Sequence, residues 1–402
     1  MTTDLEALHL KADLVARGLS VDPARNGAPP HDVVDLVLPT NLRVAVPVRI
    51  DAQPAASYRL VDEDDRTFLE ANDGREPSTR IPVQMARRPQ FYGDRTTTGR
   101  LMSEIGLVRG QAVVITPGGA CGYSLRGAPC AFCVEGGREV QTGTSVVPPA
   151  DVMEVVRTAR REGAVRVVLL NTASFDREDG GLAFLAPYIE AIRRHVDTLI
   201  AVQMHPPRDT RWVDHAYALG VDALSYNLEF FDPEACNRHC SGRARFIGRE
   251  RYLDMLAHAA RVFPRGAVWS ELVTGIESPD ATMAGIDALA RLGVLPVISV
   301  PRATGASSAA PDASRDRLTA VLRHLGATVG TRQTNAGWIP ELSLAITPLE
   351  ARRASEQPPG SALALQAWIA RSRLGGVVTR GLSRVRRRLR VHRTRDSASS
   401  AH

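Results

Sequence analysis

Short apolar runs alternate with amphipathic segments through the middle of the chain. Strands are predicted where the runs are continuous and rich in branched residues, at 111–116, 165–171, 198–204, 221–229, 267–274 and 295–300. Helices are predicted where apolar residues recur every three or four positions, at 151–163, 182–195, 211–220, 249–263 and 279–293. Six such repeats predict a parallel sheet with helices outside. Because eight would close a barrel, we expect an α/β fold with a partial (β/α)6 TIM-type barrel.

The regions on either side of these repeats lack the same regularity. Residues 1–100 form an N-terminal extension, which ends in a segment at 89–99 rich in hydrogen-bonding side chains. Its predicted elements are a helix near the start and strands at 41–50, 57–62 and 67–71. The barrel is expected to occupy 101–330, with a further helix at 315–325. Residues 331–402 form a C-terminal extension that ends in a basic, Arg-rich tail.

The basic character of the chain is concentrated in that tail. The net charge is +6, but residues 371–402 hold ten Arg and a single acid, Asp396, so the remaining 40 basic and 43 acidic residues carry a net charge of −3. Such a block either contacts nucleic acid or an acidic partner, or forms a solvated tail. Like-charge blocks favour the solvated tail, so nucleic acid is not the expected partner.

The cellular setting follows from what the sequence contains at its start and in its cysteines. The first residues include acids and no apolar export signal, and no apolar run is long enough to span a bilayer, which predicts a cytoplasmic protein without membrane contact. Five cysteines, an odd number, argue against a disulfide framework and for metal or redox chemistry. Lys11 is the single lysine beside 49 Arg, a bias typical of a GC-rich genome and consistent with biosynthesis in specialised metabolism.

The segment with the clearest chemical signal follows the first barrel strand. It reads TPGGACGYSLRGAPCAFCVEGG and places Cys121, Cys130 and Cys133 in a C-x8-C-x2-C pattern, with Phe132 before the last cysteine. Active sites of parallel α/β barrels lie at the carboxyl ends of the strands, where this loop falls. Three thiolates are one fewer than a structural zinc or a simple electron-transfer cluster takes. The alternatives are a zinc site completed by a distant residue, or unliganded core thiols.

The C-A-F-C ending resembles the C-x-φ-C half of the signature of the radical S-adenosylmethionine (radical SAM) superfamily, in which φ is aromatic. The superfamily spacing is commonly C-x3-C-x2-C, so this chain resembles a subgroup with a stretched cluster loop and an FY…T leader. The resemblance covers about residues 85–305. It implies a [4Fe–4S] cluster held by Cys121, Cys130 and Cys133, with one open iron that binds S-adenosyl-L-methionine (SAM). It also implies reductive cleavage of SAM, hydrogen abstraction from a small-molecule substrate, and a flavodoxin or ferredoxin as electron donor.

The same resemblance assigns candidate SAM contacts to the following strands. After the second strand come Thr172 and Ser174, where hydroxyls or carbonyls would replace a Gly-Gly-Glu motif. On the fourth strand, Ser225, Asn227 and Glu229 alternate and so share one face, where they would bind SAM or form a hydrogen-bonded core network. The remaining cofactor candidates are the aromatic residue of the cysteine motif, a basic residue after strand four and two residues after strand five: Phe132, Arg243, Gly275 and Glu277.

Catalytic candidates come from strand ends and from a second pair of cysteines. Glu271 lies on the fifth strand at a position that can face the barrel interior. Weaker substrate-side candidates are Gln203, His205 and Arg302. Cys236 and Cys240 form a C-x3-C pair after strand four. These two are inert thiols, ligands of an auxiliary cluster, or a source of a hydrogen atom donated by Cys240.

Two rival functions remain open on the sequence. One is a tRNA-modifying radical SAM enzyme that binds RNA through its Arg-rich tail. The other is a zinc-binding module without catalysis, which the regular β/α repeats disfavour.

Overall fold

The computed structural model describes most of the extension and nearly all of the barrel. The described residues are 3–20, 33–48, 58–64, 66–71, 80–118, 121–133, 146–163, 165–172, 177–301, 315–331 and 345–353, with the isolated positions 381 and 385. Within that part of the chain, we find no helix with the length and apolar character needed to cross a bilayer.

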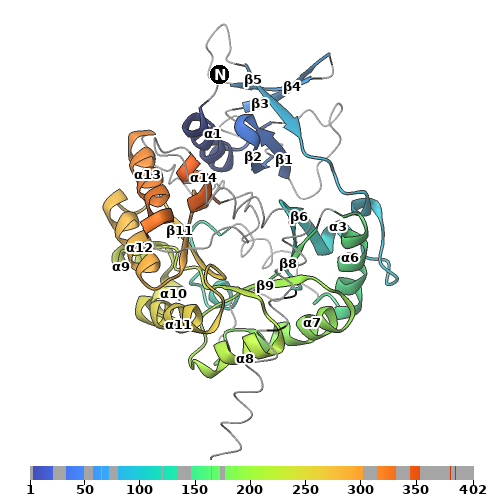
Figure 1. Cartoon of the computed structure of the whole chain (residues 1–402), viewed down its shortest axis with the longest axis vertical. Coiled ribbons are helices and arrows are strands. Elements are labelled where there is room, and N and C mark those ends of the chain that lie inside the picture. The colour runs from blue at the N-terminus through green and yellow to red at the C-terminus, as the bar shows by residue number, and fades with distance from the viewer. Residues whose placement is uncertain are drawn as a thin grey trace, which may run out of the picture.

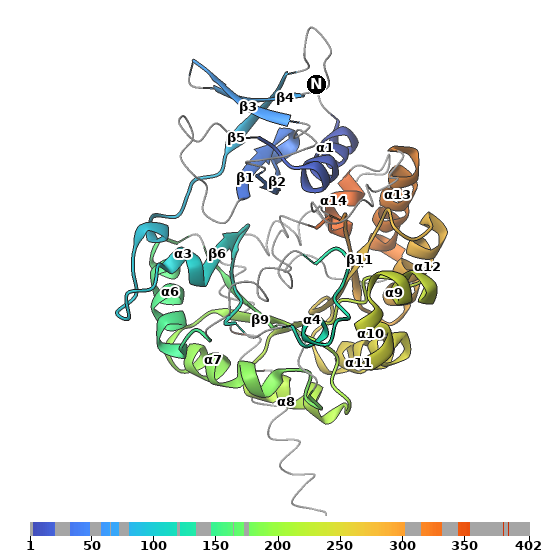
Figure 2. The ribbon, with the colours of Figure 1, turned by 180° about the vertical axis from the view of Figure 1, so that it is seen from behind.

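The larger unit is a curved seven-stranded sheet with helices on its outer side (Figures 1 and 2). Its strand order is β12-β11-β10-β9-β8-β7-β6, the reverse of the sequence order, as expected for consecutive β/α repeats. The strands are β6 (Gly106–Arg109), β7 (Ala112–Ile115), β8 (Val167–Asn171), β9 (Leu199–Gln203), β10 (Ala223–Ser225), β11 (Val268–Val273) and β12 (Leu295–Ser299). The six from β7 to β12 are parallel, so the predicted partial barrel is confirmed.

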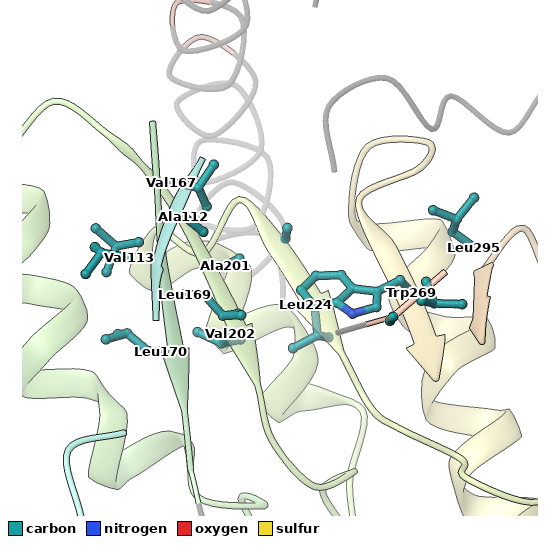
Figure 3. Packing of buried hydrophobic residues seen from close by; sticks show 14 of the residues in the cluster. Ala112, Val113, Val167, Leu169, Leu170, Ala201, Val202, Leu224, Trp269 and Leu295 are labelled. Atoms are coloured by element: carbon teal, nitrogen blue, oxygen red, sulfur yellow. The ribbon is translucent and has the colours of Figure 1, made fainter. Parts of the chain in front are cut away.

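The outer helices follow the predicted positions closely. They are α6 (Pro149–Arg161), α7 (Leu182–His195), α8 (Arg211–Leu219), α11 (Arg249–Val262), α12 (Pro279–Arg291) and α13 (Arg315–Thr331). Strands between two layers of side chains are apolar on both faces, and β8 and β9 are buried at every position except their last. Figure 3 shows side chains of these strands, including Leu169 and Leu170 of β8, in the packed core.

Two features of the barrel differ from the predictions. β6 adds an antiparallel strand at the β7 edge, which the sequence analysis did not identify. β10 ends at Ser225, whereas the prediction continued to Glu229. The alternating pattern continues past Ser225, but the backbone leaves the sheet there, and Glu229 returns to make a single bridge to Leu272 with a left-handed φ of 68°. Ser225, Asn227 and Glu229 are therefore not brought onto one face by strand alternation.

The N-terminal extension contains a helix and a second sheet. α1 (Asp4–Arg17) begins with a capping box formed by Thr3 and Glu6. The antiparallel sheet has the order β2-β1-β5-β4-β3. Its strands are β1 (Val33–Leu38), β2 (Leu42–Pro47), β3 (Tyr58–Glu63), β4 (Arg66–Ala71) and β5 (Arg80–Met85). The predicted strands correspond to β2, β3 and β4, while β1 and β5 were not predicted.

The hydrogen-bonding segment at 89–99 fastens the extension to the barrel helix α6. Glu162 accepts hydrogen bonds from the backbone N–H groups of Gln90 and Phe91 at 3.0 and 2.7 Å. In the first turn of α6, at the opposite end from Glu162, Asp151 accepts a hydrogen bond from the Thr98 hydroxyl at 2.6 Å. This segment passes through the short helices η3 (Gln90–Gly93) and α3 (Met102–Ile105) before entering β6. Its polar residues therefore have structural partners on α6.

The described part of the C-terminal extension contacts both the barrel and the N-terminal extension. Ile346 exchanges two backbone hydrogen bonds with Ile298 of β12, at 2.9 and 2.6 Å. The helix that follows, α14 (Pro348–Arg353), places Glu350 2.9 Å from Lys11 of α1, and the Lys11 side chain is 1% exposed. The only lysine of the chain thus forms a buried ion pair that joins α1 to α14.

Replacing Lys11 with Met should lower the free energy of unfolding by about 3–5 kcal/mol, because Glu350 would keep a buried charge without its partner. The double variant Lys11→Met/Glu350→Met should recover most of that loss, since both charges are then removed. Urea unfolding followed by circular dichroism measures both. A loss below about 1 kcal/mol in Lys11→Met would show that the ion pair does not hold the two units together.

Candidate active site

The cysteine loop leaves the carboxyl end of β7, where the sequence analysis placed it. Cys121 precedes the short helix α4 (Gly122–Leu125), and Cys130 and Cys133 lie in a turn in which the Cys133 N–H donates to the Cys130 carbonyl at 3.1 Å. Figure 2 shows α4 close to α10, on the same side of the barrel as α9 and α11. The loop therefore faces the region that follows β10.

That region folds into two short helices, α9 (Pro233–His239) and α10 (Ser241–Phe246), which the loop contacts directly. The Ala131 N–H donates to the His239 carbonyl at 2.8 Å. At Gly242, a Cβ atom would lie 2.6 Å from the Ala128 carbonyl oxygen and 2.7 Å from the Tyr123 ring. Only glycine allows this close approach, so Gly242 is required for the loop to dock.

The contact between the cysteine loop and the helices α9 and α10 has an apolar centre. Phe230, Ala235, Cys240 and Val273 are buried together, and Cys130, Phe132, Cys236 and Ile276 pack against them. Phe132 meets Phe230 edge-to-face with ring centroids 5.6 Å apart. The aromatic residue of the cysteine motif, predicted as a cofactor contact, thus packs against the turn after β10.

The three predicted cluster ligands differ in their surroundings. Cys121 and Cys130 are half-buried and Cys133 is exposed. Cys130 packs against the buried cluster that contains Cys240, and its interactions with the Cys240 thiol and the Arg243 charge lower the pKa of Cys130 to about 6 against the effect of burial. Among the described residues, no group of three or more His, Cys, Asp or Glu side chains is arranged to hold a metal ion. The ligand set Cys121, Cys130 and Cys133 therefore stays a prediction.

Arg243 is the centre of a buried polar network below the loop. Its guanidinium lies 3.0 Å from the Glu229 carboxylate and donates to the Asn227 carbonyl at 2.7 Å and to the Tyr252 hydroxyl at 3.0 Å. Its Nε is buried without a hydrogen-bond partner among the described residues. A buried donor without a partner is costly, so this atom marks a place where an acceptor group would bind.

Glu229 supports this arginine from a strained position. It is one of four described non-glycine residues with a positive φ, and burial raises its pKa to about 8 even though Arg243 lowers it. Non-glycine residues with a left-handed backbone are found preferentially at functional sites.

A second chain of polar contacts continues from the end of β10 to β11. The Ser225 hydroxyl donates to the Asn227 side-chain oxygen at 2.6 Å, and the Asn227 amide donates to Glu271 at 3.4 Å. Ser225 and Asn227 are buried, and Glu271 is half-buried. Four predicted residues (Ser225, Asn227, Glu229 and Glu271) are thus brought together, by tertiary hydrogen bonds and not by the predicted strand.

Two aromatic residues of the network were missed by the sequence analysis. The Tyr252 hydroxyl on α11 accepts from Arg243 and lies 3.2 Å from His205 Nδ1. Burial lowers the pKa of His205 well below its ordinary value, so the ring is neutral. Tyr123, in the cysteine loop, meets the His205 ring edge-to-face at 5.4 Å. In the sequence, Tyr252 is one more apolar position of an amphipathic helix, so no local signal marks it.

The remaining predicted residues have varied positions. Glu277 is buried and accepts backbone hydrogen bonds from Phe231 and Asp232 at 3.0 and 2.9 Å, so it fixes the turn into α9. Gly275 has a φ of 91° in the turn after β11. Thr172 is buried, and its N–H donates to the Gln203 carbonyl. Ser174 and Arg302 lie outside the described residues.

The donor set fits the chemistry of an iron–sulfur cluster. Thiolates are the ligating form of cysteine, and the lowered pKa of Cys130 beside the Arg243 charge favours that form. The unpartnered Nε of Arg243 offers a further donor beside the loop. Together they form an electropositive, partly dry site at the carboxyl ends of the strands, which suits an anionic ligand group.

Comparisons with known proteins add only distant similarity. No protein-family model and no curated protein matches the sequence. Methylornithine synthase (PylB) aligns over 54% of this chain and 62% of its own, at 13% identity and a TM-score of 0.43. The FeFe-hydrogenase maturase HydG from Carboxydothermus hydrogenoformans aligns over 55% and 54%, at 16% identity and 0.41.

A third solved structure is the radical S-adenosylmethionine methyltransferase TsrM from Kitasatospora setae, with cobalamin and a [4Fe–4S] cluster bound. It aligns over 58% of this chain and 47% of its own, at 17% identity and a TM-score of 0.33. This chain spans less than two thirds of the length of each of the three proteins.

Proposed function

We propose that this chain is a radical SAM enzyme that binds a [4Fe–4S] cluster through Cys121, Cys130 and Cys133. The observation that carries the proposal is the docking of the three-cysteine loop over the buried Arg243 network at the carboxyl ends of the barrel strands. When bound, such a cluster supplies one electron for reductive cleavage of SAM. The resulting 5′-deoxyadenosyl radical would abstract hydrogen from a small organic substrate, in the cytoplasm and within specialised metabolism.

The residues of the network have distinct parts in this proposal. Arg243 would bind the SAM carboxylate through the Nε atom that lacks a partner, while Glu229 keeps its guanidinium in place. Asn227 would bind the ribose hydroxyls from its place just after β10, where its amide also donates to Glu271. Ser225 orients Asn227 through its 2.6 Å hydrogen bond.

Other predicted contacts would complete the proposed SAM site. Thr172 and Ser174 would bind the amino group of SAM, and Gly275 offers a backbone on which the adenine could stack. Glu277 would act indirectly, because it already holds the turn into α9. Glu271, which is half-buried, is the proposed catalytic residue on the substrate side.

Anaerobic reconstitution with iron and sulfide tests the proposal against a zinc site. The radical SAM assignment predicts a brown protein with about four iron atoms per chain and an EPR signal after reduction with dithionite. A colourless protein that retains zinc and gives no EPR signal would support the zinc-binding alternative. No described observation favours an RNA substrate, since the Arg-rich tail lies almost wholly outside the described residues.

An electron donor would meet a basic and partly apolar surface beside the loop. Leu125 of α4 is 68% exposed, and Arg126 and Arg245 are both exposed and stack on Phe246, 4.9 and 5.3 Å from its ring centroid. Apart from its tail, the chain carries a net charge of −3, so this group of cations is a local feature. It complements an acidic carrier such as a flavodoxin or ferredoxin.

The double variant Arg126→Glu/Arg245→Glu should slow cluster reduction by a reduced flavodoxin by about tenfold or more at low salt, because like charges oppose the encounter. Reduction by dithionite should be unchanged. The matched control Arg194→Glu, on the exposed end of α7, should reduce at the wild-type rate. Stopped-flow absorbance measures all three proteins, and equal flavodoxin rates in the two variants would contradict this docking surface.

A further inference from the structure

Three described groups meet the outer nitrogens of the Arg243 guanidinium. Nη1 donates to the Asn227 carbonyl at 2.7 Å and to the Tyr252 hydroxyl at 3.0 Å, and Nη2 lies 3.0 Å from the Glu229 carboxylate. Because a guanidinium is planar and its donors point in fixed directions, contacts at both outer nitrogens fix the orientation of the whole group. Nε, which is buried without a hydrogen-bond partner among the described residues, is a donor that remains for a ligand.

Tyr252 is the partner of Arg243 that comes from the outer layer of helices. It lies on α11 with 2% of its surface exposed, and its hydroxyl is 3.2 Å from His205 Nδ1 as well as 3.0 Å from Arg243. Burial holds the pKa of Tyr252 well above its ordinary value and that of His205 well below it, so both side chains are neutral. Neither therefore carries a charge that would draw Arg243 away from Glu229.

His205 is held in place on two sides. Its ring meets the Tyr123 ring of the cysteine loop edge-to-face, with centroids 5.4 Å apart, and Tyr123 stacks on Phe246 of α10 at 6.1 Å. On the backbone side, a Cβ atom at Gly180 would overlap the His205 carbonyl oxygen, so the segment that precedes α7 lies directly against it. A side chain fixed in this way gives the Tyr252 hydroxyl a constant partner.

We propose that Tyr252 and His205 are positioning residues, which hold the Arg243 guanidinium in the orientation that leaves Nε free to bind the SAM carboxylate. This inference rests on the proposed function, since it takes that carboxylate as the ligand of Arg243. An arginine side chain has many rotamers, and a group that is already held in its binding orientation loses less conformational freedom when the ligand arrives. The two residues thus raise the affinity for SAM without contacting it.

Equilibrium dialysis of the anaerobically reconstituted full-length protein with labelled SAM tests the inference. Tyr252→Phe removes one hydroxyl and should raise the Kd for SAM about tenfold, the factor that corresponds to a hydrogen bond to a charged group. His205→Leu should raise the Kd about threefold, because it acts one contact further away. His205→Asn retains a hydrogen-bonding group close to the place of Nδ1, so its Kd should stay near the wild-type value.

Two controls separate positioning from stability. Tyr188→Phe removes the hydroxyl of another buried tyrosine on an outer helix, which is 3% exposed and donates to the Val147 carbonyl at 2.7 Å. It should lower the melting temperature about as much as Tyr252→Phe does and leave SAM binding unchanged. The second control is decarboxylated SAM, measured by competition. Its Kd should be the same in Tyr252→Phe and the wild type, since it lacks the group that Arg243 binds.

The inference is wrong if Tyr252→Phe binds SAM as tightly as the wild type. It is also wrong if Tyr252→Phe weakens the binding of SAM and of decarboxylated SAM by the same factor, because the loss would then not depend on the carboxylate. Equal losses of SAM affinity in Tyr188→Phe and Tyr252→Phe, or in His205→Asn and His205→Leu, would overturn it as well. A wild-type protein that binds no SAM contradicts the proposed function instead, so the two failures are distinguishable.

Discussion

Alanine at Cys121, Cys130 or Cys133, introduced one at a time, will remove the cluster and abolish SAM cleavage. Each substitution takes away one of three ligands, and the remaining two thiolates cannot hold an iron–sulfur cluster whose fourth iron must stay open. Iron and sulfide analysis after anaerobic reconstitution measures the loss directly. We expect iron near background in all three variants.

Alanine at Cys236 or Cys240 provides the control for that experiment. These two thiols belong to α9 and the turn that follows it, and they pack against the cysteine loop without being among its three predicted ligands. Their removal should therefore leave the iron content close to wild type. Changes next to a metal ligand typically cost about 10–100-fold in affinity. The ligand assignment would be wrong if any member of the Cys121, Cys130 and Cys133 set could be replaced without loss of iron, or if Cys236→Ala lost as much.

Arg243→Leu is the second substitution for which we expect a large effect. The guanidinium contacts Glu229, the Asn227 carbonyl and the Tyr252 hydroxyl, so its loss leaves a buried carboxyl without its partner. We expect the free energy of unfolding to fall by about 3–5 kcal/mol. SAM binding should also be lost, because the proposed carboxylate donor is gone. Urea unfolding and equilibrium dialysis with labelled SAM measure the two effects.

A second variant separates the structural part from the binding part. Arg243→Leu/Glu229→Leu removes both polar partners and should regain much of the lost stability, since two apolar side chains replace a buried polar pair. It should still fail to bind SAM. An exposed control, Arg194→Ala, should change stability by about 0.5 kcal/mol or less. If the double variant binds SAM normally, Arg243 is only a structural residue.

The barrel could be predicted because its strands are buried on both faces. Continuous apolar runs such as 165–171 and 198–204 have few alternatives in a long α/β chain, and β8 and β9 occupy them. β6 has only four residues and follows a short helix, so its pattern is too brief to identify. The strands β1 and β5 were missed for a related reason, since half-exposed antiparallel strands carry a weaker apolar signal.

The site could be predicted only in its residue types. The cysteine spacing identified the loop, and polar residues at strand ends identified Asn227, Glu229 and Glu271. Their contacts depend on where the chain leaves β10, which is decided by tertiary bonds such as the 3.0 Å bond from the Leu228 N–H to the Ser270 hydroxyl. Tyr252 gave no signal because its ring packs like any apolar residue and only its hydroxyl joins the network.

Cleavage of SAM by the reduced protein is the result on which the whole account depends. The anaerobically reconstituted chain, incubated with dithionite and SAM, should release 5′-deoxyadenosine, detected by liquid chromatography and mass spectrometry, while the Cys130→Ala variant releases none. A wild-type protein that holds a reduced [4Fe–4S] cluster, binds SAM and still yields no 5′-deoxyadenosine would contradict the proposed chemistry.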